Sequence, residues 1–345
     1  MWWSHHADRK TRQSTVFQVR IGEKVSETIC GYKAKTIKSV IRRKVDQWLK
    51  SIDDTALRAT VADNVIVTGG CIASMLLGEE VNDFDIYFRD HDTTLAVAQY
   101  YLSKFKTRKH AGIDVPLSVQ DDGTRIRIVA KSAGIASEGG SDKPYQYFEG
   151  QPDEEGGEYV SDIITDPSAI EDAYEETEGK AQKTEGDKRG KYRPIFMTSN
   201  AITLSDKVQV ILRFYGEPDA IHENYDYIHC TNYWKSWDGG ELVLRPEALE
   251  ALLSRTLNYV GSKYPICSVV RMRKFVQRGW RINAGQILKM AVQISELNLK
   301  DISVLEDQLT GVDTAYFVQL IERLKAKDSE RVDSAYLVEI IDKIF

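Results

Sequence analysis

The chain has 345 residues, of which 42% are hydrophobic and 28% are charged, a balance typical of a soluble protein with two or three domains. No apolar run approaches the roughly 20 residues that span a bilayer, and no cleavable signal peptide is recognisable. The four cysteines lie far apart without a C-x-x-C pair, which argues against a disulfide framework and a zinc site. The composition therefore predicts a cytoplasmic protein that does not enter a membrane.

The formal net charge of -6 conceals segments of opposite sign. Residues 1–50 carry twelve Lys/Arg and four Asp/Glu, and residues 255–281 carry seven bases and no acid. Residues 141–190 carry fifteen acids and five bases, so the rest of the chain has a net charge of +4. Basic segments of this kind can attract the phosphate backbone of a nucleic acid.

The first predicted element is an amphipathic basic helix over residues 37–52, within a basic N-terminal extension that covers residues 1–60. A strand, a short helix, a second strand and a longer helix follow, over residues 64–70, 72–77, 83–88 and 93–106. Short β-branched runs alternate here with helical spacing. The pattern favours a sheet with helices packed against it.

An acidic, glycine-rich stretch over residues 135–191 interrupts this pattern. It contains too few clustered apolar residues to offset the entropy of ordering it, so we expect a partly disordered insertion with a short helix over residues 170–177. The insertion is either a solubilising loop or a segment that competes with a polyanion. Extended segments are predicted beyond it, over residues 194–198, 201–204, 207–214 and 226–230.

From residue 246 onward the pattern is helical, which predicts an α+β domain over residues 61–243 and a helical domain over residues 244–345. A short repeat lies near the C-terminus, where residues 312–324 return in similar form at residues 332–344. Two copies are too few for a solenoid. We expect two packed helices that offer a surface to a second copy of the chain or to another partner.

The strongest chemical signal is a pair of glycines, Gly69 and Gly70, followed at a fixed distance by Asp83 and Asp85. Glycines between a strand and a helix let the backbone approach a phosphate and direct amide N–H groups at it. Asp83 and Asp85 are two residues apart on a strand, so their side chains point to the same face. Paired carboxylates of this kind hold Mg²⁺ together with substrate phosphates, and two such metals promote phosphoryl transfer.

This pattern, G-G-x-I-x-x-x-L-L-G-x-x-x-x-D-x-D-I, resembles the active-site signature of the nucleotidyltransferase superfamily that includes DNA polymerase beta. Its spacing is most similar to the head domain of class II CCA-adding enzymes and bacterial poly(A) polymerases. The resemblance implies a mixed sheet flanked by helices over residues 61–243. It also implies that Asp83 and Asp85 bind Mg²⁺ and that Gly69 and Gly70 cradle a nucleoside triphosphate.

The chain departs from the family at two places. The Arg-Asp pair that helps to organise the family's nucleotide site is replaced by Ala73 and Ser74, so Ser74 occupies a nucleotide-binding position with a different side chain. The strand that normally supplies a third carboxylate carries Gln209 instead. The next predicted strand resembles the family's Arg-Asp-Phe-Thr motif and offers Asp226. Asp226 either completes or supports the metal site, or it only pairs with a basic neighbour.

A second resemblance lies in the helical part, where residues 270–282 are similar to the neck helix of the same enzymes. Arg271, Lys274 and Phe275 match the R-x-x-R-F pattern, and Trp280 replaces a phenylalanine. The resemblance implies that Arg271 and Lys274 lie near the incoming nucleotide. The Glu-Asp pair that begins the family's base-reading motif is absent, so no base preference is carried over.

These features predict a template-independent nucleotidyltransferase that transfers a nucleoside monophosphate to an acceptor hydroxyl and releases pyrophosphate. The expected acceptor is an RNA 3′ end, because the two basic segments can line a phosphate track. Two alternatives remain open. One is a toxin-like enzyme of the same fold that modifies a protein or a small molecule. The other is a catalytically inactive scaffold that binds nucleotide or RNA.

Overall fold

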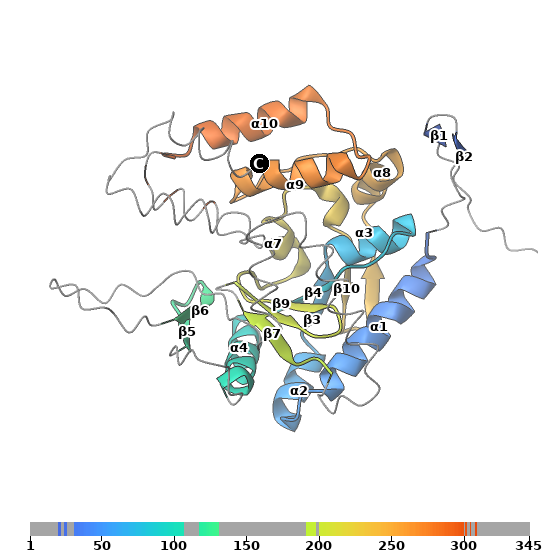
Figure 1. Ribbon diagram of the computed structural model, residues 1–345. Coiled ribbons are helices and arrows are strands. Elements are labelled where there is room, and N and C mark those ends of the chain that lie inside the picture. Colours follow the sequence, from blue (N-terminus) through green and yellow to red (C-terminus); the bar gives the residue numbers. More distant parts are fainter. Residues whose placement is uncertain are drawn as a thin grey trace, which may run out of the picture.

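The computed structural model describes residues 31–106, 117–130, 191–197 and 200–299, together with short pieces at residues 20–21 and 24–25 and single positions at 301, 304 and 308. These residues form a seven-stranded sheet with helices packed on it and further helices beyond it (Figure 1). The predicted α+β class is therefore confirmed. The acidic stretch at residues 141–190, its expected short helix and the C-terminal repeat lie outside the described residues.

The helices are α1 (Ala34–Lys50), α2 (Thr55–Ala62), α3 (Gly70–Leu77), α4 (His91–Lys106), α7 (Pro218–His222), η1 (Ile228–Cys230), α8 (Pro246–Ser254), α9 (Pro265–Gln277) and α10 (Ala284–Ser295). The large sheet contains β3 (Val65–Thr68), β4 (Phe84–Phe88), β7 (Pro194–Met197), β8 (Ala201–Leu204), β9 (Val208–Ile211), β10 (Tyr233–Lys235) and β11 (Glu241–Val243). Two small hairpins pair β1 (Arg20–Ile21) with β2 (Lys24–Val25) and β5 (Leu117–Asp121) with β6 (Ile126–Ala130). None of the described helices is long and apolar enough to cross a lipid bilayer.

The strands of the large sheet follow the order β11-β10-β3-β4-β9-β8-β7. The central pair β4–β9 is parallel and the other pairs are antiparallel, so the sheet is mixed. Successive side chains of a strand point to opposite faces. Val67, Ile86 and Val210, which are in register, therefore share one face. Ile66 and Tyr87, which are in register with each other, lie on the opposite face.

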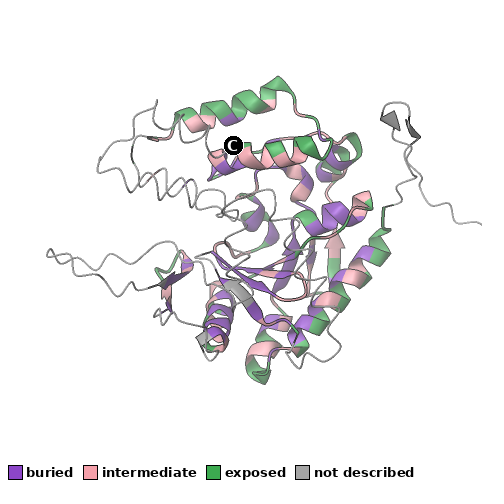
Figure 2. Cartoon of the chain, viewed as in Figure 1, coloured by how far each residue is buried: buried purple, intermediate pink, exposed green. Residues whose placement is uncertain are grey.

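Each face of the sheet has its own apolar core, and the buried strands occupy the middle of the molecule (Figure 2). The larger core packs the sheet against α1, α2, α3 and α4, and the indole N–H of Trp48 donates to the Tyr101 hydroxyl there at 2.8 Å. The smaller core joins the opposite face to α7 through Ile66, Tyr87 and Ile221. The predicted helix at residues 37–52 is thus a core element, formed as α1.

A third apolar cluster joins the helical part to the sheet. Tyr227, Tyr259, Trp280 and Met290 pack together there, and Ala73 of α3 belongs to the same cluster. The prediction of helices beyond residue 246 is confirmed for the described residues by α8, α9 and α10. Helix α3 contributes to this cluster and to the largest core, so it packs against both the helical part and the sheet.

The predicted strand over residues 226–230 is wrong. The amide of Val260 donates to the carbonyl of Asp226 at 2.9 Å, and the amide of Ile228 donates to that of Asn258 at 3.1 Å. A single turn of 3-10 helix, η1, follows immediately. The segment pairs with the helical part because β10 already occupies the place beside β3 in the sheet. The predicted extended segments at residues 194–198, 201–204 and 207–214 are confirmed as β7, β8 and β9.

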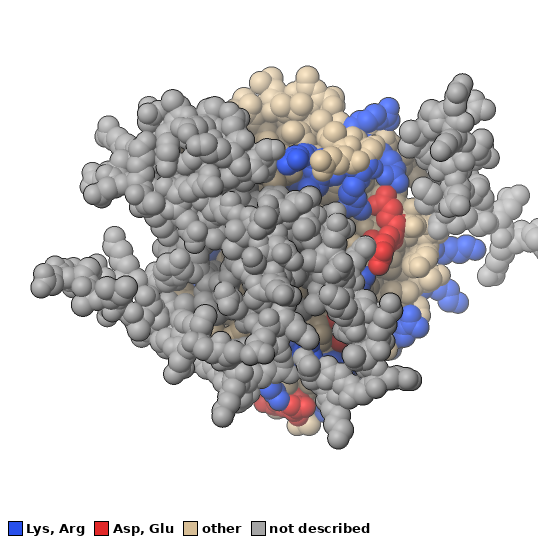
Figure 3. All heavy atoms as spheres, in the orientation of Figure 1, with Lys and Arg blue, Asp and Glu red and all other residues tan. Residues whose placement is uncertain are grey.

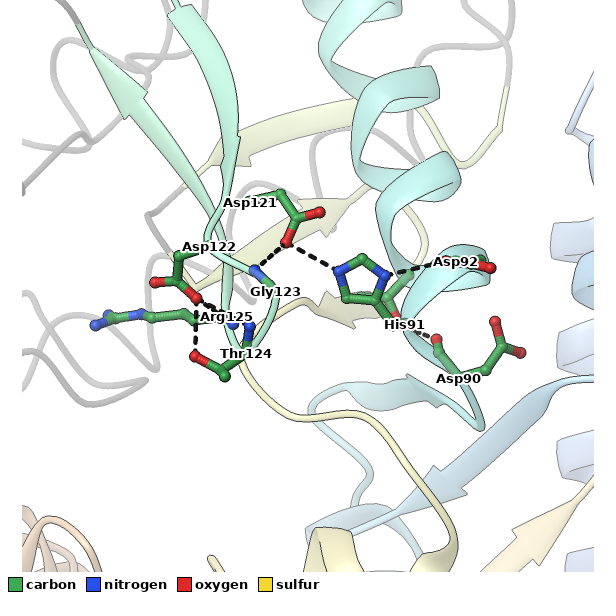
Figure 4. Close-up of polar contacts among 9 residues, drawn as sticks. Asp90, His91, Asp92, Asp121, Asp122, Gly123, Thr124 and Arg125 are labelled. Carbon is green, nitrogen blue, oxygen red and sulfur yellow. Dashed lines mark hydrogen bonds and ion pairs between the residues drawn. The ribbon is translucent and has the colours of Figure 1, made fainter.

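The β5–β6 hairpin, which the sequence prediction missed, is fastened to the first residue of α4 (Figure 4). His91 bridges two carboxylates, with its Nε2 2.9 Å from Asp121 Oδ1 and its Nδ1 3.1 Å from Asp92 Oδ1. These two hydrogen bonds raise the pKa of His91 above 6.5, and the bond to Asp121 contributes more than the bond to Asp92. Asp122 caps the hairpin turn by accepting from the amides of Thr124 and Arg125.

Candidate active site

The predicted glycine pair forms the turn between β3 and α3. Gly69 has φ of 93°, a conformation that L side chains rarely adopt, and its amide donates to the carbonyl of Cys230 at 3.2 Å. A Cβ atom on Gly69 would lie 2.9 Å from Asp85 Oδ2, whereas a Cβ atom on Gly70 would meet nothing within 4 Å. Gly69 thus allows the close approach of Asp85, and the space beside Gly70 is open at the start of α3.

Asp83 and Asp85 lie at the beginning of β4, next to this turn. Asp83 is exposed and Asp85 is half-buried. The pKa of the Cys71 thiol is raised well above its ordinary value, first because the thiol is buried and then because the negative charges of Asp85 and Asp83 act on it. The same two carboxylates contribute, behind burial, to the raised pKa of Tyr87. The carboxylates of Asp83 and Asp85 therefore both lie near Cys71, the residue that follows Gly70.

Asp85 has a defined neighbour on each side in the sheet. Thr68 of β3 pairs with it on one side and Gln209 of β9 on the other. Side chains in register on adjacent strands point to the same face, with the strands about 4.8 Å apart. The position to which the resemblance assigns a third carboxylate thus lies directly beside Asp85, and it holds the amide of Gln209.

Neutral polar groups surround these carboxylates on the same face of the sheet. The hydroxyls of Tyr87 and Tyr225 are 3.1 Å apart, and burial raises the pKa of Tyr225 well above its ordinary value. Thr68 Oγ1 lies 2.8 Å from His222 Nε2. Burial, helped by Arg245, lowers the pKa of His222 to about 3, so its ring is neutral. Sequence reasoning missed this layer because its partners come from distant segments, although the alternation of β4 places Tyr87 on the face of Asp85.

Asp226 approaches the site from the segment that joins the sheet to the helical part. Its Oδ2 accepts from Arg271 Nη1 of α9 at 2.7 Å, and the two side chains are 12% and 24% exposed. Asp226 and Asp85 also both contribute, behind burial, to the raised pKa of Cys230. Asp226 therefore lies near the predicted carboxylates but is bound to Arg271. Within the described part of the chain, no group of three or more His, Cys, Asp or Glu residues is placed to hold a metal ion.

The remaining predicted residues lie on the two helices that meet here. Ser74 is buried in α3, and its carbonyl accepts from the amide of Glu79 at 2.9 Å. Lys274 is half-buried on α9, one turn beyond Arg271.

Glu79 joins α3 to two arginines of the helical part. Its carboxylate oxygens accept from Arg255 at 2.9 Å and from Arg278 at 2.7 Å. Lys and Arg side chains gather over this end of α9, with acidic side chains beside them (Figure 3). Part of the basic segment at residues 255–281 is therefore neutralised within the chain.

The two carboxylates of β4 suit a magnesium ion. Mg²⁺ takes oxygen ligands, and it is commonly held by one or two carboxylates together with substrate phosphates and water. Asp83 and Asp85 supply such carboxylates beside a helix N-terminus with open space, where backbone N–H groups and the helix dipole favour a phosphate. The two carboxylates and the adjacent helix N-terminus together fit a magnesium ion that also binds a phosphate group.

Two solved structures are similar at low TM-score: a Thermotoga maritima CCA-adding enzyme complexed with tRNA (13% identity, 81% of this chain and 54% of that chain, TM-score 0.34) and a CCA-adding enzyme in complex with CTP (11%, 87% and 53%, 0.35). The Gabija anti-defense 2 protein of Bacillus phage SPbetaL7 is 22% identical over 140 residues, which cover 40% of this chain. The chain spans about a third (33%) of that relative's length. The model of the family described as Gabija anti-defense 2 family protein matches residues 39–255, and the chain belongs to this family.

Proposed function

We propose that this chain is a metal-dependent nucleotidyltransferase. The observation that carries the proposal is the close approach of Asp85 to the Gly69 turn at the start of α3, with Asp83 two residues earlier on the same strand end. In the reaction, an acceptor hydroxyl oxygen attacks the α-phosphorus of a nucleoside triphosphate. The bond from the α-phosphorus to the bridging oxygen breaks, pyrophosphate leaves, and the hydroxyl proton passes to solvent.

In this proposal each residue of the site has a distinct task. Asp83 and Asp85 hold Mg²⁺, which, when bound, stabilises charge on the attacking and leaving oxygens. The backbone at Gly69 and Gly70 receives the triphosphate, because amide N–H groups at a helix start attract phosphate. Arg271 lies near the nucleotide and is oriented by its ion pair with Asp226. Asp226 thus supports the site through Arg271.

Lys274 and Ser74 belong to the periphery of the proposed nucleotide site. Lys274 follows Arg271 by one turn of α9, so the two side chains share a face of the helix. Ser74 follows Gly70 by one turn of α3. Both residues are partly or fully buried, so we expect them to shape the site more than to contact bulk solvent.

We further propose that the acceptor is an RNA 3′ end and that the modification counters the defence system for which the family is named. Support comes from the excess of basic residues in residues 1–50 and from the name of the phage relative. Two solved structures with some likeness are described with tRNA and with CTP, but their TM-scores are too low to decide the substrate.

The test is a labelling assay with the full chain, α-labelled nucleoside triphosphates, Mg²⁺ and a mixture of RNAs. The wild type should label RNA and release pyrophosphate, and Asp85→Asn should do neither. Asp63→Asn, an exposed carboxylate at the end of α2, removes the same charge and should retain activity. Equal labelling by Asp85→Asn would refute the mechanism. Labelled protein without labelled RNA, in a whole-cell extract, would transfer the proposal to a protein acceptor.

A second function is favoured by one specific observation, the amide of Gln209 in register with Asp85. A site with two carboxylates in place of three suits a protein that binds a nucleotide without transferring it. Calorimetry separates the two functions: a scaffold binds nucleoside triphosphate equally well with Mg²⁺ and with EDTA, and it releases no pyrophosphate with any acceptor.

A further inference from the structure

Helix α1 has two chemically opposite sides. Its inner side is buried in the largest core through Ile37, Ile41, Val45 and Trp48. Five cations point outward, and we call them the α1 basic face: Lys35, Lys38, Arg42, Arg43 and Lys50. Four of the five are exposed and Lys38 is half-buried. A sixth cation, Lys44, turns inward, where its Nζ donates to the carbonyl of Asp206 at 2.7 Å.

Ion pairing distinguishes the α1 basic face from the arginines nearest the candidate site. No ion pair within the described part of the chain involves any of its five residues. By contrast, the bases of the second basic segment that lie nearest the site are paired. Arg255 and Arg278 share Glu79, and Arg271 binds Asp226. The positive charge of the α1 basic face is therefore not compensated by an ion pair within the described residues.

The charge distribution of α1 opposes the stability of the helix. Its first turn contains no acid, and Lys33 at the N-cap forms no side-chain cap, so cations stand at the positive end of the helix dipole. Lys38 and Arg42 repel each other at i and i+4. Asp46 is the one acid of the helix and relieves part of this repulsion near Arg42. A bound polyanion would relieve the remainder.

The N-terminal end of α1 lies beside helix α3, whose first turn belongs to the candidate site. Tyr32, two residues before α1, joins this segment to α3, since its amide donates to the carbonyl of Met75 at 2.7 Å. Met75 is five residues beyond Gly70, so this contact lies about 8 Å along the helix axis from the start of α3. Figure 1 shows α1 beside α3, and Figure 3 shows Lys and Arg side chains along the same edge of the molecule.

We propose that the α1 basic face binds the sugar-phosphate backbone of the RNA acceptor. This inference rests on the proposed function, because the acceptor of that reaction is the RNA in question. An RNA backbone fits better than a membrane surface, since the apolar side of α1 is buried in the core and is not free to enter lipid. The sequence-independent attraction of phosphates suits cations without fixed partners.

The experiment measures binding of a fluorescent single-stranded RNA to the full chain by anisotropy, in EDTA and without nucleotide, across a range of salt concentrations. The variant replaces Lys38, Arg42 and Arg43 with glutamine. We expect its plot of log affinity against log salt to be shallower by about 2, since each phosphate contact contributes about 0.7. The variant should also melt no lower than the wild type, because the repulsion along α1 is gone.

A matched control removes three cations elsewhere, at Arg58, Lys104 and Lys235, and changes the net charge equally. It should keep the wild-type salt slope. Equal slopes for the two triple variants would overturn the inference. So would loss of binding to anionic lipid vesicles in the α1 variant while RNA binding is retained.

The outcome is separable from that of the proposed function. If the α1 variant loses RNA affinity but the wild type transfers no nucleotide, the binding surface stands and the proposed chemistry fails. If the wild type labels RNA in an Asp85-dependent manner and the α1 variant binds RNA as tightly as the wild type, the chemistry stands and the surface fails.

Discussion

Alanine at Gly69 should destabilise the protein and displace Asp85. An L residue at φ of 93° costs about 1–2 kcal/mol, and the new methyl group, 2.9 Å from Asp85 Oδ2, adds about 1 kcal/mol by moving that side chain. We therefore expect the free energy of unfolding to fall by about 2–3 kcal/mol. This corresponds to a melting temperature lower by roughly 4–12 °C.

Gly70→Ala is the matched control, because its methyl group meets no atom within 4 Å. Alanine also favours a helix over glycine, so the unfolding free energy should stay level or rise by up to about 1 kcal/mol. Urea titrations of both variants measure the difference. A Gly69→Ala protein within about 0.5 kcal/mol of the wild type would show that the turn is not constrained by Asp85. If Gly70 faces the triphosphate, its alanine variant should fold normally but lose the rise in melting temperature that nucleotide gives.

Two further predictions concern ion pairs. In a double-mutant cycle, Arg271→Ala and Asp226→Asn should each cost about 1–3 kcal/mol of unfolding free energy, and the double variant should cost less than their sum; additive costs would mean that the pair contributes nothing. The raised pKa of His91 means that its bridge to Asp121 stabilises the hairpin below pH 6.5 and is lost as pH rises through that raised pKa. Hydrogen exchange of β5–β6, corrected for intrinsic rates, should therefore show less protection at pH 8 than at pH 6, and His91→Gln should remove the difference.

The elements that could be predicted from the sequence are those specified locally. The strand, glycine turn, helix and second strand that carry Gly69 and Asp85 follow from short-range periodicity, and they formed as expected. Two missed elements also have local signals. Asp54 caps α2 by accepting from two amides, and Asp122 with Gly123 is a hairpin turn sequence.

The placement of Asp226 could not be predicted in the same way. Its side chain is held by Arg271, 45 residues further along the chain, and its carbonyl by Val260. Nothing in residues 225–230 distinguishes a strand in the sheet from a bridge to the helical part, because both are extended at Tyr227. Which cations are paired is equally invisible to sequence, since Glu79, which binds Arg255 and Arg278, lies about 180 and 200 residues before them.

The register between β4 and β9 has an evolutionary consequence. Because Gln209 lies in register with Asp85, a carboxylate at this one position would adjoin the existing pair without any movement of the backbone. Glutamine and glutamate codons differ by a single base, and the two side chains have nearly the same volume. A single base change at position 209 would thus place a third carboxylate beside Asp85.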